Sequence, residues 1–118
     1  MILVDTSVWV EHLRHGSARL RGLLLGGQVL AHPFVIGELA CGWLEPREQV
    51  LALLRQLPQA EQAEEEEVLA FIDRHRLYGC GLGWIDVHLL ASTLLSRATL
   101  WTHDRRLARA AARLNIGA

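Results

Sequence analysis

The first nine residues, Met1 to Trp9, constrain the fold more than any other stretch of the chain. Ile2, Leu3 and Val4 are apolar without alternation, which favours a strand covered on both faces, as in a parallel sheet between helices. Asp5 then stands at the carboxyl end of that strand, at the edge of an α/β sheet where ligands collect. Asp is also a common cap for a helix, and a helix starting near Thr6 would explain it equally well. The segment alone leaves both interpretations open.

The length of 118 residues fits one domain, covering 1–118. No apolar run approaches the length of a membrane span, and the start lacks the basic region and long apolar core of a signal peptide. Cys41 and Cys80 have no metal-type spacing, so we expect them to be buried thiols of a reducing compartment. These observations favour a cytoplasmic protein that does not contact a membrane.

Short apolar segments alternate with helical patterns along the chain. Strands are expected at 2–4, 28–31 and 99–102, with weaker candidates at 59–63 and 114–116. Helices are expected at Thr6 to Gly16, Ser17 to Gly26, Pro33 to Gly42, Glu45 to Pro58, Glu64 to Tyr78, Ile85 to Leu95, and after Asp104. This alternation indicates an α/β fold with a parallel sheet.

Charge is distributed unevenly, although the formal net charge is only -1. Glu61 and the run from Glu64 to Glu67 form an acidic block, which suits the positive end of a helix dipole. The last quarter of the chain is basic, with Arg97, Arg105, Arg106, Arg109 and Arg113. The basic final helix offers contacts to phosphates, a source of affinity that does not depend on sequence.

Three further carboxylates occur in otherwise apolar surroundings. Glu38 lies within the third helical pattern, Asp86 opens the most apolar helix, and Asp104 follows the strand expected at 99–102. Buried or half-buried acids cost several kcal/mol unless they are paired or bound to a cation. Together with Asp5, these acids suggest a shared Mg²⁺ or Mn²⁺ ion. The alternative is that Asp86 and Asp104 cap helices while Glu38 pairs with an arginine.

The four acids stand in motifs that resemble those of PIN-domain ribonucleases. The motifs are Val4-Asp5-Thr6-Ser7, Gly37-Glu38-Leu39 with Gly42, Gly83-Trp84-Ile85-Asp86 with Leu89-Leu90-Ala91, and Thr102-His103-Asp104. In order and spacing they are most similar to the VapC toxins of bacterial and archaeal toxin-antitoxin pairs. The resemblance implies a three-layer α/β/α PIN-like domain with a central parallel sheet of about five strands. It also implies a Mg²⁺-dependent endoribonuclease that acts as a toxin on RNA.

Hydrolysis of a phosphodiester gives each acid a role in that interpretation. A bound Mg²⁺ can supply a nucleophilic water and stabilise charge that grows on the phosphate oxygens. Asp5, Asp86 and Asp104 would hold the metal, with Mn²⁺ as a substitute, and Glu38 would orient or deprotonate the water or serve as a ligand. Thr6, Ser7 and Thr102 can hydrogen-bond the carboxylates or the substrate. Because four neighbouring acids repel one another, at least one should have a raised pKa without metal.

Two histidines and two other function classes complicate this interpretation. His88 and His103 stand beside two of the acids, where the resemblance does not lead us to expect histidine, and we expect His103 to project into solvent.

A catalytically silent PIN-like interaction module could instead receive a partner's arginine in the acidic pocket. A phosphatase or phosphotransferase of another α/β family is a more distant alternative, because no second acid follows Asp5 by two residues.

Apolar side chains are numerous for so small a domain, so we expect part of them to form an exposed patch at an interface. The candidates are Trp9, Leu13, Leu20, Leu23, Leu24, Trp43 and Leu44. The resemblance implies a homodimer and a groove for a cognate small antitoxin. We expect the antitoxin to lay an apolar helix against the first two helices and to insert an arginine into the acidic pocket, in competition with Mg²⁺. The alternative is that these side chains fill the core, above all Leu23 and Leu24.

Overall fold

A parallel sheet forms the centre of the protein in a computed structural model that describes residues 1–118. Strand β1 (Ile2–Val4) lies between β2 (Val29–Leu30) and β3 (Thr99–Trp101) and is parallel to both. In the register of the sheet, Leu3 pairs with Leu30 and with Leu100. Leu3 and Val4 are both completely buried and point to opposite faces, which confirms that the first strand is covered on both faces.

The sheet has three strands, so the expected number of about five is wrong. An isolated parallel bridge joins Ala31 to Gln59 beyond β2, and another joins Leu100 to Gly117 beyond β3. The weaker candidate at 59–63 is thus reduced to the bridging residue Gln59, and the candidate at 114–116 is wrong, because the bridge lies at Gly117 instead. Pro58 precedes the first bridge and has no N–H to donate. Asn115 has a φ of 59°, so the chain turns just before the second bridge and leaves too few extended residues for a strand.

Seven helices connect and cover the strands. They are α1 (Thr6–His15), α2 (Ala18–Leu25), α3 (Pro33–Cys41), α4 (Arg47–Gln56), α5 (Glu65–His75), α6 (Trp84–Leu95) and α7 (Arg105–Arg113). Their bounds follow the expected capping residues: Ser17 accepts a hydrogen bond from the backbone N–H of Leu20, and Pro33 is the first residue of α3. Helix α5 ends before the expected Tyr78 because Arg76 adopts the left-handed conformation.

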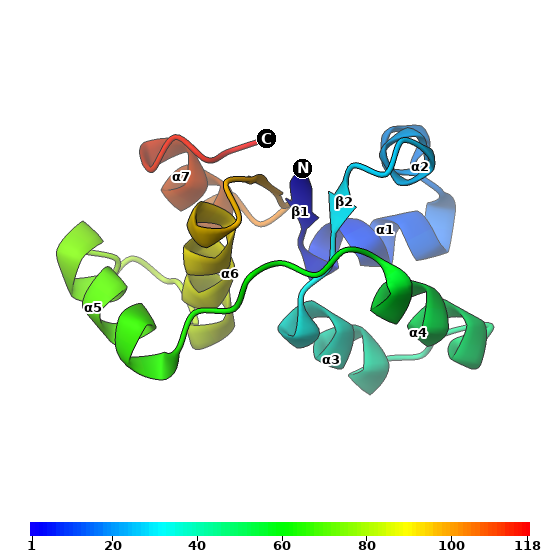
Figure 1. The fold of residues 1–118 in the computed structure, drawn as a ribbon, viewed down its shortest axis with the longest axis horizontal. Coiled ribbons are helices and arrows are strands. Elements are labelled where there is room, and N and C mark those ends of the chain that lie inside the picture. Colours follow the sequence, from blue (N-terminus) through cyan, green and yellow to red (C-terminus); the bar gives the residue numbers. More distant parts are fainter.

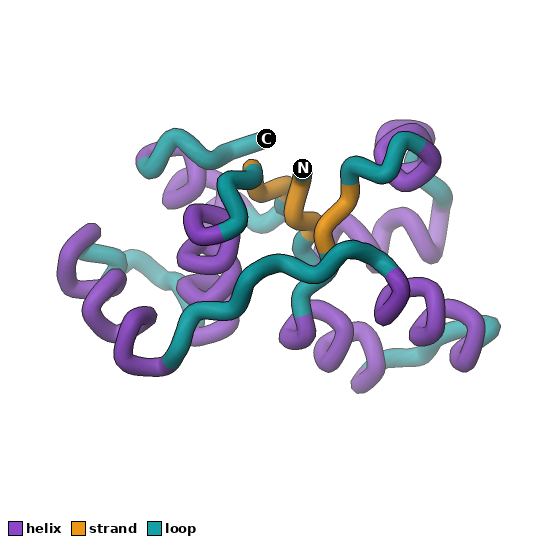
Figure 2. The backbone as a smooth tube through the Cα atoms, viewed as in Figure 1, coloured by secondary structure: helices purple, strands orange, loops and turns teal.

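The helices lie on both sides of the sheet. Figure 1 shows the strands at the centre, with α1 to α4 on one side and α5 to α7 on the other. Helix α6 packs between β3 and α5, and its residues Val87 to Thr93 are all buried. Figure 2 shows the connection from α4 to α5 crossing from one group of helices to the other. This arrangement confirms the three-layer α/β/α fold.

Both cysteines are exposed, so the expectation of buried thiols is wrong. Cys41 is the last residue of α3, at the exposed end of that helix. Cys80 lies in the turn that follows α5, where its Sγ donates a hydrogen bond of 3.0 Å to the carbonyl of Leu77. None of the helices combines the length and the apolar character that crossing a membrane requires.

Most of the apolar side chains that we considered for an interface belong to the core. Trp9, Leu20 and Leu44 are buried, and Leu23 and Leu24 are half-buried and pack against the core. Leu13 and Trp43 are 40% and 87% exposed, respectively. The sheet and its helices therefore leave only part of the expected patch uncovered.

Candidate functional site

Three of the four acids lie at one edge of the sheet because β1 and β3 are parallel neighbours. Asp5 directly follows β1, and Asp104 comes shortly after β3. Asp86 lies in the first turn of α6, which packs against β3. The negative charges of Asp104 and Asp5 both raise the pKa of Asp86, as only nearby charges can. The structure therefore brings these three carboxylates together.

Asp5 is held by two hydroxyl groups. Its side chain is 7% exposed, and its Oδ2 accepts hydrogen bonds from Ser7 Oγ at 2.8 Å and from Thr102 Oγ1 at 2.7 Å. The Asp5 side chain makes no capping hydrogen bond to α1, although Asp5 occupies the N-cap position. The interpretation of Asp5 as only a helix cap is therefore wrong. Its carboxylate is directed toward β3 instead.

Backbone N–H groups fix the direction in which these two hydroxyls donate. The N–H of His103 donates to Ser7 Oγ at 3.0 Å, and the N–H of Asp104 donates to Thr102 Oγ1 at 3.0 Å. Each hydroxyl thus accepts from the backbone and gives its own proton to Asp5. The network joins the end of β1 to the loop that carries Asp104. The prediction that Ser7 and Thr102 hydrogen-bond a carboxylate of the site is confirmed.

Asp86 and Asp104 also cap helices, as the alternative interpretation supposed. Asp86 Oδ2 accepts a hydrogen bond of 2.9 Å from the N–H of Gly83. Asp104 Oδ1 accepts from the N–H groups of Arg106 at 2.9 Å and Leu107 at 3.0 Å. Each cap uses one carboxylate oxygen and leaves the other without a protein hydrogen bond. Capping therefore positions both acids, and the other oxygen of each carboxylate remains available to bind a metal ion.

Asp86 has the perturbed acidity that a cluster of carboxylates predicts. Burial raises its pKa most, the hydrogen bond from Gly83 opposes that shift, and the charges of Asp104 and Asp5 raise the pKa further. The expectation that at least one acid has a raised pKa is confirmed. A cation placed among these groups would stabilise the ionised form.

Glu38 differs from our expectation because its side chain is exposed. Its Oε1 accepts a hydrogen bond of 2.7 Å from Thr6 Oγ1, so its partner is a hydroxyl group and not an arginine. Thr6 directly follows Asp5, and α3 packs against α1. This contact places Glu38 at the residue that follows Asp5, and its Oε2 has no protein partner. Asp104 is exposed as well, so the free-energy cost of burying an unpaired acid applies only to Asp5 and Asp86.

The donor set fits a hydrated hard cation better than a cage made entirely of protein ligands. No three His, Cys, Asp or Glu side chains are arranged to hold a metal ion by themselves. Each of the four acids, however, has one oxygen held by the protein and one oxygen free. Mg²⁺ retains several waters and binds through one or two carboxylates together with substrate phosphates. The carboxylates therefore suit Mg²⁺ with part of its water shell in place.

His88 and His103 are close to two of the acids in the sequence, but neither ring hydrogen-bonds an acid in the structure. His103 is exposed, and its ring lies edge-on to Trp101 at 6.0 Å, which agrees with the expected projection into solvent. His88 is buried between the rings of Phe34 and Trp84, at centroid distances of 4.8 and 4.6 Å. Burial lowers the pKa of His88, so at neutral pH this ring is an uncharged packing group.

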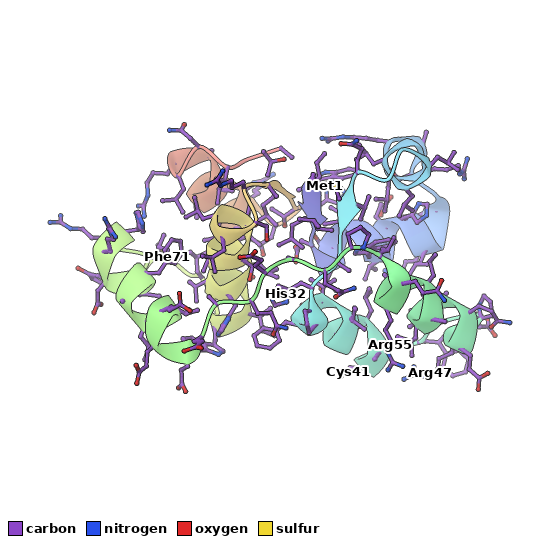
Figure 3. The ribbon with its side chains drawn as sticks, viewed as in Figure 1. Met1, His32, Cys41, Arg47, Arg55 and Phe71 are labelled. Atoms are coloured by element: carbon purple, nitrogen blue, oxygen red, sulfur yellow. The ribbon has the colours of Figure 1, made fainter.

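His32 is a buried polar residue that our sequence analysis missed. Figure 3 labels it at the start of α3. Its Nδ1 accepts a hydrogen bond of 3.0 Å from the N–H of Phe34, so the neutral ring donates from Nε2 to Ser92 Oγ, also at 3.0 Å. Burial, and to a lesser extent repulsion from His88 when that ring is protonated, lowers the pKa of His32 to about 4. The only sequence signal was its position directly before Pro33, where a helix cap is expected.

Comparison with known proteins agrees with this geometry. The chain matches the PIN domain family over residues 2–113. It is 49% identical to Ribonuclease VapC32 of Mycobacterium tuberculosis, in strain CDC 1551 and in strain H37Rv. Each alignment spans 117 residues, which are 98% of this chain and 94% of the relative. On the strength of its acidic sheet edge and these similarities, the chain belongs to the PIN-domain family and is related to the VapC ribonucleases.

Proposed function

We propose that this protein is a Mg²⁺-dependent endoribonuclease and the toxin of a toxin-antitoxin pair. The observation that carries the proposal is the gathering of Asp5, Asp86 and Asp104, whose hydrogen bonds come from hydroxyls and backbone N–H groups and not from arginines. These acids repel one another unless a cation joins them. Membership of the PIN-domain family and the similarity to Ribonuclease VapC32 support the choice of RNA as substrate.

The acids have different tasks in this proposal. Asp5, Asp86 and Asp104 would hold Mg²⁺, and Mn²⁺ could take its place. The ion would supply a nucleophilic water and stabilise charge on the phosphate. Ser7 and Thr102 hold the carboxylate of Asp5 in its orientation through hydrogen bonds.

Glu38 acts as the general base in this proposal. The hydroxyl of Thr6 holds Oε1, which leaves Oε2 free to orient the attacking water and to accept its proton. Thr6 therefore serves as a positioning residue for the base.

Cleavage of total RNA with Mg²⁺ or with a chelator tests the proposal. We expect cleavage by the wild-type protein in Mg²⁺, none with chelator, and none from Asp5→Asn or Glu38→Gln. Asp73→Asn, at an exposed acid of α5, is the matched control and should retain full activity. Undiminished cleavage with chelator and in both variants would reject the assignment. A folded wild-type protein without cleavage would favour the silent interaction module, which uses the same pocket for a partner's arginine.

We propose that the antitoxin binds beside the acidic site. Val10 and Leu13 of α1, together with Leu39, Trp43 and Leu44, line a groove of about 130 Å³ that also reaches Glu38. An apolar side chain of an antitoxin helix would fill this groove, and an arginine at the end of that helix would come close to the carboxylates. The groove lies between α1 and the end of α3, so this proposal places the antitoxin on α1 and α3, whereas the sequence led us to expect α1 and α2.

Co-expression with the neighbouring small protein tests this partner. We expect a complex that is less active on RNA than the free protein and that Leu13→Arg weakens. Leu25→Arg, at an 85% exposed leucine of α2, is the control and should leave the complex intact. Absence of a complex, or a complex as active as the free protein, would refute the antitoxin proposal.

We also propose that the protein forms a homodimer and acts in the cytoplasm, where RNA is available. Leu94 and Leu95, at the end of α6, are 39% and 42% exposed and border an apolar groove between α5 and α6. Covering such side chains is a common reason for self-association. Light scattering should give a dimer that Leu95→Arg dissociates, and a monomeric wild-type protein would contradict this.

A further inference from the structure

A groove lined by arginines lies between α7 and the turn that follows α5. It has a volume of about 230 Å³, and its lining residues are Cys80, Arg106, Arg109, Ala110 and Arg113. The three arginines are spaced by three and four residues, so they share one face of α7. All three are exposed.

The structure holds two of these arginines in place. Arg106 lies across Gly81, where an added Cβ would be 2.6 Å from the Cδ of Arg106, so the absence of a side chain at Gly81 makes room for it. Arg113 donates a hydrogen bond from Nη2 to the carbonyl of His75. No carboxylate hydrogen-bonds any of the three guanidinium groups. Their positive charges therefore add up in a concave surface, which attracts anions.

Both walls of the groove lead to the acidic site. Asp104 caps α7 through the N–H of Arg106, so the arginine face begins within one turn of this acid. The opposite wall continues from Gly81 to Gly83, whose N–H donates to Asp86. From Arg106 to Arg113 the face extends about 10 Å along the helix, at the usual rise per residue. The groove thus starts at the acids and runs away from them.

We infer that this groove binds the phosphates of single-stranded RNA on one side of the scissile bond. This inference rests on the proposed ribonuclease function and assigns Arg106 and Arg109 to substrate binding. RNA is favoured over an acidic protein segment because one continuous strand can occupy the acidic site and the groove together. Contacts to phosphates add affinity without reading the sequence.

The salt dependence of RNA binding tests the inference. The measurement uses the full chain with Asp86→Asn, which keeps the RNA intact, and a single-stranded oligonucleotide followed by fluorescence anisotropy. The slope of log K, the logarithm of the association constant, against log salt is negative. Removing one phosphate contact reduces the magnitude of this slope by about 0.7 for single strands. We expect that decrease for Arg106→Gln and for Arg109→Gln, and about twice that decrease for the double variant.

Arg55→Gln is the matched control. Arg55 is an exposed arginine of α4, and Figure 3 labels it on the side of the molecule away from α7. Its neutralisation makes the same change in net charge, and we expect the slope to stay that of the parent. Thermal unfolding should show that all variants remain folded, since each substitution is at an exposed helical position.

Kinetics of the otherwise wild-type enzyme provide a second readout. With a long RNA, Arg106→Gln and Arg109→Gln should raise KM and leave kcat unchanged, and with a dinucleotide they should change neither. Unchanged slopes, an equal effect of Arg55→Gln, or a loss of antitoxin binding in place of RNA binding would each overturn the inference. Absence of cleavage by a wild-type protein whose RNA binding still depends on these arginines would refute the proposed function alone.

Discussion

Thr102 donates a hydrogen bond of 2.7 Å to the carboxylate of Asp5, although 97 positions separate the two residues in the chain. The contact exists because β1 and β3 are adjacent and parallel, so their carboxyl ends meet. It ties the most buried acid of the site to the loop that carries Asp104. The orientation of Asp5 therefore depends on a residue from the opposite end of the sequence.

We predict that Thr102→Val reduces RNA cleavage and metal affinity by about 10- to 100-fold, the usual cost of losing a group that orients a metal ligand. Valine keeps the shape of threonine and removes the proton that Asp5 accepts. Thr99→Val, on the same strand, is the control and should cleave RNA at the wild-type rate. Equal cleavage rates for both variants would show that the hydroxyl does not position Asp5.

We predict that Asp86→Asn abolishes cleavage and raises the melting temperature of the metal-free protein. The raised pKa of Asp86 means that its ionised form is disfavoured in the folded state, so its charge lowers stability at neutral pH. Asparagine removes the charge and can still accept the hydrogen bond from Gly83. Calorimetry with and without Mg²⁺ measures the effect, and Asp73→Asn should leave the melting temperature unchanged. A lower melting temperature for metal-free Asp86→Asn would contradict the prediction.

We predict that the buried ring of His32 makes the protein less stable as the pH falls from 6.5 to 4. The pKa is lowered to about 4 in the folded state from 6.5, so in this window the unfolded chain binds a proton that the folded protein does not. Stability is therefore complete above pH 6.5 and falls by up to about 3 kcal/mol as the pH approaches 4.

Denaturant unfolding over this pH range tests the role of His32. In His32→Asn, where asparagine can still cap α3, this part of the decrease should disappear, even if the variant is less stable throughout. His15→Asn, at an exposed histidine of α1, should retain the wild-type pH dependence. Parallel curves for wild type and His32→Asn would exclude the buried ring as the cause.

We predict that Mn²⁺ supports RNA cleavage and that Ca²⁺ binds without supporting it. Ca²⁺ has a larger and looser coordination shell, which positions the attacking water poorly. All three ions should raise the melting temperature of the wild-type protein, because each binds the folded state. Asp5→Asn should weaken this shift for every ion. Full cleavage in Ca²⁺ alone would disprove the prediction.

Much of the site was predictable from local sequence. The apolar run Ile2 to Val4 placed Asp5 at a strand end, and the alternation of helices and strands brought Asp104 to the same edge. The capping roles of Asp86 and Asp104 also follow from short spacing in the chain. These features depend on neighbours a few residues apart, whose conformational preferences are largely local.

Other properties required the tertiary structure. The burial of His32 against Ser92, the exposure of Cys41 and Cys80, and the packing of Arg106 over Gly81 depend on which distant segments meet.

The sequence by itself determined the order of the helices and the position of the first strand, and it singled out the four candidate acids. Only the tertiary structure decided which carboxylate oxygens are held and which are free, and which acid has a raised pKa. It also reduced the strand expected at 59–63 to a single bridge and placed the other bridge at Gly117, just after the strand expected at 114–116. The physical reason is that the burial, hydrogen bonding and electrostatic interaction of a side chain depend on distances in space, which packing sets between residues as far apart as Asp5 and Thr102.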